Sequence, residues 1–364
     1  MAFGVAVPDP ASGSTNDDMT TWARKARNGI LAATAGAVLC VAGSLAAYAT
    51  TLEAVRARGY INCGVADGPL GFSHVNDRGI WSGLEVDFCA ALAAAVLGNK
   101  DAVKYRPLAM TNRFAALRAN EVDLLARSAT WTLSRDTDLG ARFVETLFHD
   151  GQGLLVRRSQ GVASVLELSG ASICVSANGP AQQNLNEFFG QRGMRFTAIA
   201  FEKWDDAVRA YVNKRCTALS AEVTTLALVR ASSGSVNEHQ QLPEVLSKEP
   251  LSPVVRQGDE QWFGIVRWVL FALLTAEEHG VTSSNVDAAR SSDLVEVRRL
   301  LGVDGDLGAS LGLSRDWAYQ VIKQSGNYGE MFERNVGMKS PLRLERMANN
   351  LWSKGGLMHA PPFR

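Results

Sequence analysis

The sequence predicts an α/β protein of two lobes joined by a two-stranded hinge, with a helical extension at its C-terminal end. Strand-like and helix-like segments alternate from Thr51 onward, which indicates parallel sheets covered by helices. Two extended stretches, at 153–157 and 251–255, bracket one compact α/β segment. The 364 residues also suffice for about two domains of ordinary size.

Residues 1–49 are expected to form an N-terminal extension and a signal peptide. A basic cluster over 24–27 precedes an apolar, Ala-rich run over 30–47, and Ala47-Tyr48-Ala49 supplies the small residues of a cleavage site. These three features together are typical of a secretory signal peptide. An uncleaved membrane anchor is the alternative, because the run approaches the ~20 residues that span a bilayer. We expect an exported, soluble protein that begins near Thr50.

The segment over 50–152 is expected to be the first part of lobe 1. Short apolar runs predict strands, and apolar residues that recur every third or fourth position predict helices. The helix that opens at Gly83 has Glu85 and Asp87 in its first turn, where acidic side chains suit the helix dipole. The expected strands are 60–66, 103–108 and 122–126, and the expected helices begin at 83 and 113.

The segment over 153–247 repeats the alternation and is expected to form lobe 2. Pro180 suits the first position of a helix, where its missing N–H has no partner to lose. The expected strands are 171–177, 196–201 and 216–221, and the expected helices begin at 180 and 204. Residues 248–364 then return to lobe 1 through an amphipathic helix over 261–278 and form the C-terminal helical extension.

Charge and residue spacing exclude several functions. The chain holds 37 Lys and Arg residues and 37 Asp and Glu residues, and the two signs are interspersed. Without a basic stripe, nucleic acid is not an expected partner. The His and Cys residues have no metal-ligand spacing, so we expect neither a metal ion nor a cofactor.

Four cysteines follow the signal peptide: Cys63, Cys89, Cys174 and Cys216. In an exported protein an even number of cysteines favours disulfide bonds. Three pairings are possible, and four inert buried thiols are the alternative. Because two cysteines fall in each α/β half of the chain, we expect the local pairs Cys63–Cys89 and Cys174–Cys216.

A polar segment follows the expected strand over 122–126. Ser128, Thr130 and Thr132 alternate, so on an extended segment their hydroxyls face one side, and Arg135 begins a new helical turn. Hydroxyls, backbone N–H groups and a guanidinium at the carboxyl end of a strand suit a bound carboxylate. The alternative is that the hydroxyls cap the next helix and Arg135 is a surface cation.

Several sequence blocks extend over the mature chain, at 58–65, 83–88, 150–153, 247–251, 255–263, 326–330 and 332–337. The block at 83–88, Gly-Leu-Glu-Val-Asp-Phe, resembles the signature of the family-3 solute-binding proteins. The other blocks resemble the general L-amino-acid-binding periplasmic proteins of bacterial ABC transporters, which belong to that family. The resemblance implies a type II periplasmic-binding-protein fold. It also implies a periplasmic monomer, not an enzyme, that closes on an amino acid or related carboxylate and delivers it to a membrane permease.

The resemblance also implies ligand contacts in lobe 1. Arg135 occupies the position of the arginine that binds the α-carboxylate in this family. Ser128 and Thr130 occupy positions that supply hydroxyl or backbone contacts to the same carboxylate. Phe72 and Trp131 occupy positions whose rings line the pocket, with core packing as the alternative for both rings.

In lobe 2 the resemblance implies contacts from Asn178, Gly179 and Glu222. Asn178-Gly179-Pro180 stands where the family usually has Gly-Thr-Thr, and Pro180 removes one backbone donor. Glu222 aligns with the aspartate that binds the α-amino group, and it is one methylene longer. We therefore expect an altered ligand preference, with helix capping as the alternative role of Glu222.

Two other functions are compatible with this fold. One is a periplasmic enzyme, such as a dehydratase of a carboxylate substrate, in which Glu222 or His74 acts as acid or base. The other is a ligand sensor for a membrane partner. The sequence contains no Ser-His-Asp or metal-ligand constellation that favours an enzyme.

Overall fold

The computed structural model describes residues 50–364 except 67, 69, 178 and 233–236. The description concerns one compact unit, Thr50–Arg364. The expected signal peptide and its cleavage site lie outside the described residues. Among the helices of the described part, none is long and apolar enough to cross a membrane.

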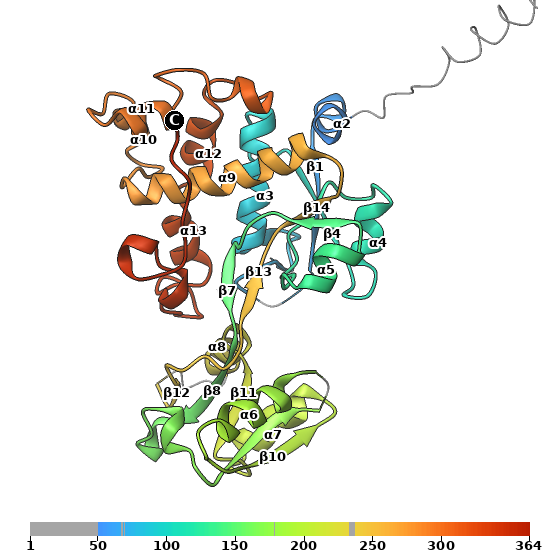
Figure 1. Ribbon diagram of the computed structural model, residues 1–364, viewed down its shortest axis with the longest axis vertical. Coiled ribbons are helices and arrows are strands. Elements are labelled where there is room, and N and C mark those ends of the chain that lie inside the picture. Colours follow the sequence, from blue (N-terminus) through green and yellow to red (C-terminus); the bar gives the residue numbers. More distant parts are fainter. Residues whose placement is uncertain (1–49, 67, 69, 178, 233–236) are drawn as a thin grey trace, which may run out of the picture. The chain divides into compact units, whose positions relative to one another are not determined.

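Lobe 1 is built on a sheet whose described strands have the order β4-β1-β5-β14-β6 (Figure 1). The strands β1, β4 and β5 are parallel, whereas β14 runs antiparallel to both of its neighbours. The sheet is therefore completed by a strand that comes from far along the sequence. The strands are β1 (Ile61–Val65), β4 (Val103–Pro107), β5 (Leu124–Leu125), β6 (Ala141–Phe143) and β14 (Val254–Arg256), and a separate hairpin pairs β2 (His74–Val75) with β3 (Trp81–Ser82).

Helix α3 lies at the centre of lobe 1 and is buried along almost its whole length, which explains its apolar, Ala-rich sequence. It packs against β1, α9 and α12. The buried indole of Trp262 in α9 donates a hydrogen bond of 3.0 Å to the carbonyl oxygen of Asp123. The helices of this part are α2 (Thr51–Arg58), α3 (Leu84–Leu97), α4 (Arg113–Arg118), α5 (Leu133–Asp138) and α9 (Glu260–Glu278).

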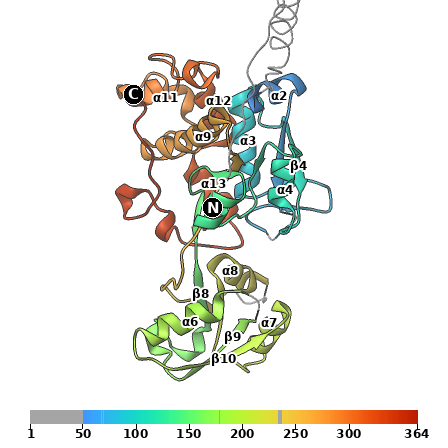
Figure 2. The same ribbon diagram turned by 45° about the vertical axis from the view of Figure 1, so that its right-hand side comes forward.

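Lobe 2 is built on a second sheet, with the described strands in the order β10-β9-β11-β8-β12. Figure 2 shows α6 and α7 on either side of β9 and β10, and each helix covers its own apolar cluster. The strands are β8 (Gln152–Arg157), β9 (Ala171–Ser176), β10 (Phe196–Phe201), β11 (Ala218–Glu222) and β12 (His239–Gln241). The helices are α6 (Ala181–Gly190), α7 (Trp204–Val212) and α8 (Val223–Ser232), with short 3-10 turns η1 (Arg158–Gln160) and η2 (Val165–Glu167).

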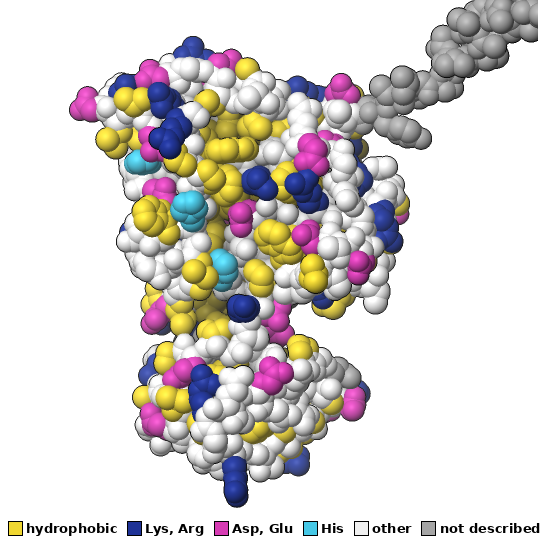
Figure 3. Space-filling model, viewed as in Figure 1, with side chains coloured by type: hydrophobic (Ala, Val, Ile, Leu, Met, Phe, Trp, Pro, Cys, Tyr) yellow, Lys and Arg dark blue, Asp and Glu magenta, His cyan; other side chains and the backbone are white. Residues whose placement is uncertain are grey.

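Two antiparallel strands connect the sheets: β7 (Phe148–Asp150) and β13 (Glu249–Leu251). Strand β7 leads directly into β8, so the chain enters the second sheet at Gln152, and the segment expected to cross at 153–157 belongs to that sheet. A two-stranded hinge is present as predicted, but its strands lie at 148–150 and 249–251, and most of the second expected crossing, at 251–255, belongs to lobe 1. On the face shown in Figure 3, acidic and basic side chains are interspersed, as the sequence predicts.

The C-terminal extension contacts both the hinge and lobe 2. The side-chain amide of Asn349 accepts a hydrogen bond from the backbone N–H of His149 and donates one to its carbonyl oxygen, at 2.7 and 3.0 Å. Arg230 of α8 donates to the carbonyl oxygens of Leu342 and Arg343. Its elements are α10 (Val286–Ala289), α11 (Val295–Leu300), η3 (Ala309–Leu311), α12 (Trp317–Ser325), α13 (Tyr328–Asn335), η4 (Met347–Asn349) and η5 (Trp352–Lys354).

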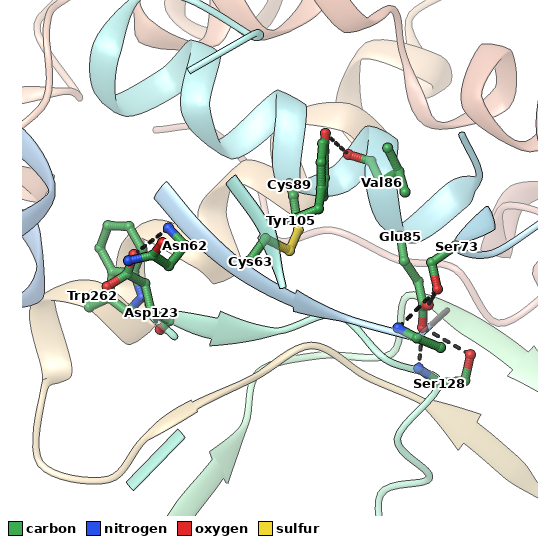
Figure 4. The surroundings of a disulfide bond; sticks show 11 residues. Asn62, Cys63, Ser73, Glu85, Val86, Cys89, Tyr105, Asp123, Ser128 and Trp262 are labelled. Atoms are coloured by element: carbon green, nitrogen blue, oxygen red, sulfur yellow. Dashed lines mark hydrogen bonds between the residues drawn. A yellow bond between two sulfur atoms is a disulfide. The ribbon is translucent and has the colours of Figure 1, made fainter. Parts of the chain in front are cut away.

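Both disulfide bonds have the local pairing. Cys63–Cys89 joins β1 to α3, with 6.3 Å between the Cα atoms (Figure 4), and Cys174–Cys216 joins β9 to the residues before β11, with 5.7 Å. All four cysteines are buried. Each bond therefore holds one lobe together internally and leaves the hinge unlinked.

The start of α3 requires a glycine. Gly83 has φ +130°, a backbone conformation that L side chains rarely adopt, and a Cβ atom there would lie 2.1 Å from the carbonyl oxygen of Phe72. This close approach allows the carbonyl oxygens of Gly71 and Phe72 to accept hydrogen bonds from Leu84 and Glu85, which begin the helix.

We predict that Gly83→Ala lowers the free energy of unfolding by at least ~2 kcal/mol, because it adds a steric clash to backbone strain. Gly79→Ala is the matched control, since Gly79 has φ +74° but a Cβ atom there would meet no described atom within 4 Å. Urea unfolding of both variants is the measurement. Equal losses in the two variants would contradict the role of the close approach.

Candidate functional site

The polar segment after β5 differs from the expected extended strand. Ser128 has φ +42°, in the left-handed region, so the alternation of three hydroxyls on one side is wrong. Thr130 instead forms an isolated bridge with Leu251, and the hydroxyl of Thr132 caps α5 by accepting from the N–H of Arg135 at 3.4 Å. The three side chains therefore have different roles.

The carboxylate of Glu85 holds this segment in place (Figure 4). It accepts hydrogen bonds from the backbone N–H and the hydroxyl of Ser128, the latter at 3.0 Å, and from the hydroxyl of Ser73 at 3.3 Å. Burial raises the pKa of Glu85, while these hydrogen bonds and the charge of Arg127 oppose the rise. The sequence pattern indicates only that Glu85 interacts with the helix dipole. It does not indicate that the carboxylate accepts hydrogen bonds from Ser128 and Ser73.

Arg135 is half-buried at the start of α5, and its Nη1 donates to the carbonyl oxygen of Thr130 at 2.9 Å. Among the described residues, no carboxylate forms a salt bridge with it. The bond to Thr130 fixes one edge of the guanidinium, and its remaining N–H groups can donate to an anion.

The two predicted ring walls have different surroundings. Phe72 is buried and its ring meets that of Phe148 edge-on, with 5.1 Å between centroids, so it packs as a core residue in this structure. Trp131 is half-buried, stacks on Phe143 at 6.1 Å, and donates from its backbone to the carbonyl oxygen of Pro250. Trp131 therefore lies beside the hinge.

Lobe 2 contains a cavity of about 250 Å³ at the carboxyl ends of its parallel strands. Its walls come from β9, β11, α6, α7 and the hinge strand β13. This is the edge at which ligands bind in open parallel sheets. The lining side chains with polar or aromatic groups include Gln152, Ser176, Asn184, Trp204, Glu222 and Glu249.

Two carboxylates and one indole line this cavity. Glu222 is exposed at the end of β11 and accepts a hydrogen bond from the hydroxyl of Thr225 at 3.4 Å. Glu249 on the hinge and Trp204 at the start of α7 are half-buried. Glu222 was predicted from the sequence, whereas Glu249 and Trp204 were missed, because neither falls in a motif that shows its position in space.

A buried amide forms the floor of the cavity. The Nε2 of Gln152 donates to the carbonyl oxygen of Ala181 and to the hydroxyl of Ser220, both at 2.9 Å, and its Oε1 accepts from Asn184 at 2.9 Å. This network joins β8, β11 and α6. It therefore positions the elements that carry the cavity wall.

The helix start predicted to contact the ligand is described only in part. Asn178 lies outside the described residues. Gly179 is exposed and has φ +118°, and Pro180 precedes the first residue of α6 and lines the cavity. Pro180, which has no backbone N–H to donate, therefore forms part of the cavity wall.

The comparisons with known proteins agree with this geometry. Residues 61–272 match the family described as bacterial extracellular solute-binding proteins, family 3. The chain belongs to this family. The match covers the sheets of both lobes and most of α9, which confirms the resemblance drawn from the sequence blocks.

Relatives of this family-3 protein match it over nearly its full length. The general L-amino acid-binding periplasmic protein AapJ of Rhizobium johnstonii is 45% identical over 340 residues, 93% of this chain and 100% of that protein. The glutamate/glutamine/aspartate/asparagine-binding protein BztA of Rhodobacter capsulatus is 45% identical, and the match covers 88% of this chain and 95% of that protein. Both are named as binding proteins rather than enzymes.

A solved structure confirms the type II periplasmic-binding-protein fold. It is an ABC transporter periplasmic binding protein from Brucella ovis with glutathione bound, 45% identical, with a TM-score of 0.76. The similarity covers 87% of this chain and 100% of that chain. The similarity therefore extends beyond the region 61–272 that matches the family.

The hinge of this family-3 protein contains a half-buried acid. Asp150 on β7 accepts hydrogen bonds from the hydroxyl of Thr224 and from the backbone N–H of Gly151, the latter at 2.9 Å. Burial raises the pKa of Asp150 to about 6 against the effect of these bonds, and the charge of Glu222 adds to the rise. The carboxyl group therefore changes charge within the neutral range.

We predict that Asp150 makes stability depend on pH between 5 and 7. Because its folded-state pKa is raised, the group stabilises the fold fully below pH ~4, and this stabilisation is lost as the pH rises through 6. From pH 5 to pH 7 the wild type should lose about 1 kcal/mol more than Asp150→Asn. Urea unfolding at both pH values measures the difference, and parallel losses would contradict the assignment.

Proposed function

We propose that this chain is the periplasmic substrate-binding component of an ABC-type amino-acid importer. One observation carries the proposal: lobe 1 presents the guanidinium of Arg135, whereas the cavity of lobe 2 presents the carboxylate of Glu222. A free amino acid carries a negative α-carboxylate and a positive α-ammonium group. Closure of the lobes would pair each end with a group of opposite charge.

Pairing of both charges explains why closure needs the ligand. Removing a charge from water without a partner costs free energy. Closure without a ligand would therefore be unfavourable, because it would bury Arg135 and the lobe 2 carboxylates unpaired. A bound zwitterion removes this cost on both sides. The ligand thereby shifts the protein toward the closed conformation.

The relatives support the ligand class and the partner. AapJ and BztA are named for amino acids, and the Brucella ovis protein has bound glutathione, which carries an α-amino acid group. The closed protein delivers its ligand to the membrane permease of the transporter. We further propose that the monomer reaches the periplasm through cleavage of the signal peptide near Thr50.

We predict that Arg135→Ala weakens binding of L-glutamine and L-glutamate by roughly 2–5 kcal/mol, because it removes a charge-assisted contact to the α-carboxylate. Isothermal titration calorimetry of the purified protein is the measurement. Arg118→Ala is the matched control, since exposed Arg118 also donates to one backbone carbonyl, that of Leu139. Unchanged affinity in the Arg135 variant would remove this residue from the site.

We predict that Glu222→Gln weakens L-glutamate at least 30-fold and leaves the affinity for glutarate, which lacks the amine, within about threefold. Glu222→Asp should broaden binding among amino acids, because it restores the shorter side chain usual in the family. Glu249→Gln is the matched control, since both carboxylates line the cavity. If only the Glu249 variant loses affinity, Glu249 binds the ammonium group instead.

A further inference from the structure

Helix α8 of lobe 2 has two apolar faces, which are buried in different cores. Leu226 and Val229 belong to an apolar cluster of lobe 2. Ala227 is buried in the large cluster formed by lobe 1 and the C-terminal extension, and Leu228 and Ala231 pack against that cluster. Residues three or four positions apart lie on one face of a helix. The second face of α8 therefore forms an interface with lobe 1.

Arg230 adds polar contacts to this interface. It is half-buried, and its Nη2 donates to the carbonyl oxygens of Leu342 and Arg343 at 2.6 and 3.2 Å. Arg343 has φ +50°, in the left-handed region that L side chains rarely adopt. Two successive carbonyl oxygens thereby accept from one guanidinium group. Backbone strain of this kind is concentrated at functional contacts and switch regions.

The loop that accepts these hydrogen bonds is fixed to lobe 1. The side chain of Leu342 is fully buried in the lobe 1 cluster. The backbone N–H of Leu344 donates to the carbonyl oxygen of Val336 at 2.9 Å. Arg346 forms a half-buried salt bridge of 3.0 Å with Glu277 of α9. The loop over 342–346 therefore moves with lobe 1 when the hinge bends.

The hinge separates this interface from the ligand cavity. Gln152 lines the cavity of lobe 2, whereas Gly151 lines a second cavity, of about 390 Å³, whose other wall includes Leu344 and Met347 of the extension. Consecutive residues of an extended strand face opposite sides. In Figure 1, β7 and β13 likewise run between α13 on the left and α5 on the right. A rotation that closes lobe 2 on the side of α5 therefore moves it away from the extension.

The cavity of lobe 2 is not covered by lobe 1 in this structure. Among the described residues that line the cavity, none belongs to the segment 128–135 of lobe 1. The interface between α8 and the extension is therefore formed while the lobes are open.

We propose that the contact of α8 with the loop over 342–346, which we call the α8 latch, holds the protein open and separates when the lobes close. The proposal rests on the proposed function, in which closure pairs both charges of an amino acid. Ligand binding must then open the latch, and the apparent affinity falls by the fraction of molecules in which the latch is open. This reduction is the same for every ligand, because the latch contacts none of them.

Arg230→Met should strengthen binding of L-glutamine and of L-glutamate by the same factor, about threefold to tenfold, because it removes the hydrogen bonds of the latch and keeps an apolar side chain. Calorimetric titration of both ligands is the measurement. Arg158→Met is the matched control, since exposed Arg158 also belongs to lobe 2 but donates within that lobe, to Gln240 at 2.9 Å. Arg230→Lys keeps the charge without the planar fork. It should tighten both ligands less, and it covers the case in which the Met variant fails to fold.

A second measurement needs no ligand. A spin label at exposed Asp138, the last residue of α5, broadens the amide resonances of α6 in closed molecules. The unliganded Arg230→Met protein should show more of this broadening than the unliganded wild type.

Unchanged or weaker binding in Arg230→Met would overturn the latch, and so would gains that differ between the two ligands. A wild type that binds neither amino acid would overturn the proposed function. In that case the spin label still tests the latch, and equal broadening in the wild type and Arg230→Met would overturn it.

Discussion

The buried carboxylate of Glu85 is the interaction on which the site edge of lobe 1 depends. It reaches from the start of α3 to the backbone and hydroxyl of Ser128, and so it fixes the left-handed turn after β5. Helix α3 can begin there only because Gly83 permits the close approach of the preceding chain. The disulfide between Cys63 and Cys89 then ties the same helix to β1. The core around the disulfide, the start of α3 and the turn at Ser128 are therefore linked to one another through α3.

In the proposed function, the two lobes divide the recognition of a zwitterion by charge. Lobe 1 presents the guanidinium of Arg135 after the end of β5, and lobe 2 presents the carboxylates of Glu222 and Glu249 in its cavity. Among the described residues, none of these three side chains forms a salt bridge. In the proposed function these charges drive binding, and the shape of the cavity around Trp204 selects among ligands of the same charge pattern.

Sequence reasoning found the features that depend on local pattern. The α/β alternation and the two-stranded hinge follow from the pattern of strand-like and helix-like segments, and the local disulfide pairing follows from two cysteines in each half. The ligand contact of Arg135 stays a prediction. The left-handed turn at Ser128 was missed because it is imposed by Glu85, which is 43 residues away.

On the outer edge of β7, the side-chain amide of Asn349 forms the two hydrogen bonds that a residue of a neighbouring strand would form. It pairs with both backbone groups of His149, while the opposite side of β7 is paired with β13. The hinge is thereby stiffer than two strands alone, and Arg230 adds a tether from lobe 2 to the same C-terminal extension. The energetic balance between open and closed populations is then set partly by residues that never touch a ligand. Evolution could tune the affinity for every ligand together through this extension, and leave the selectivity among them to the cavity.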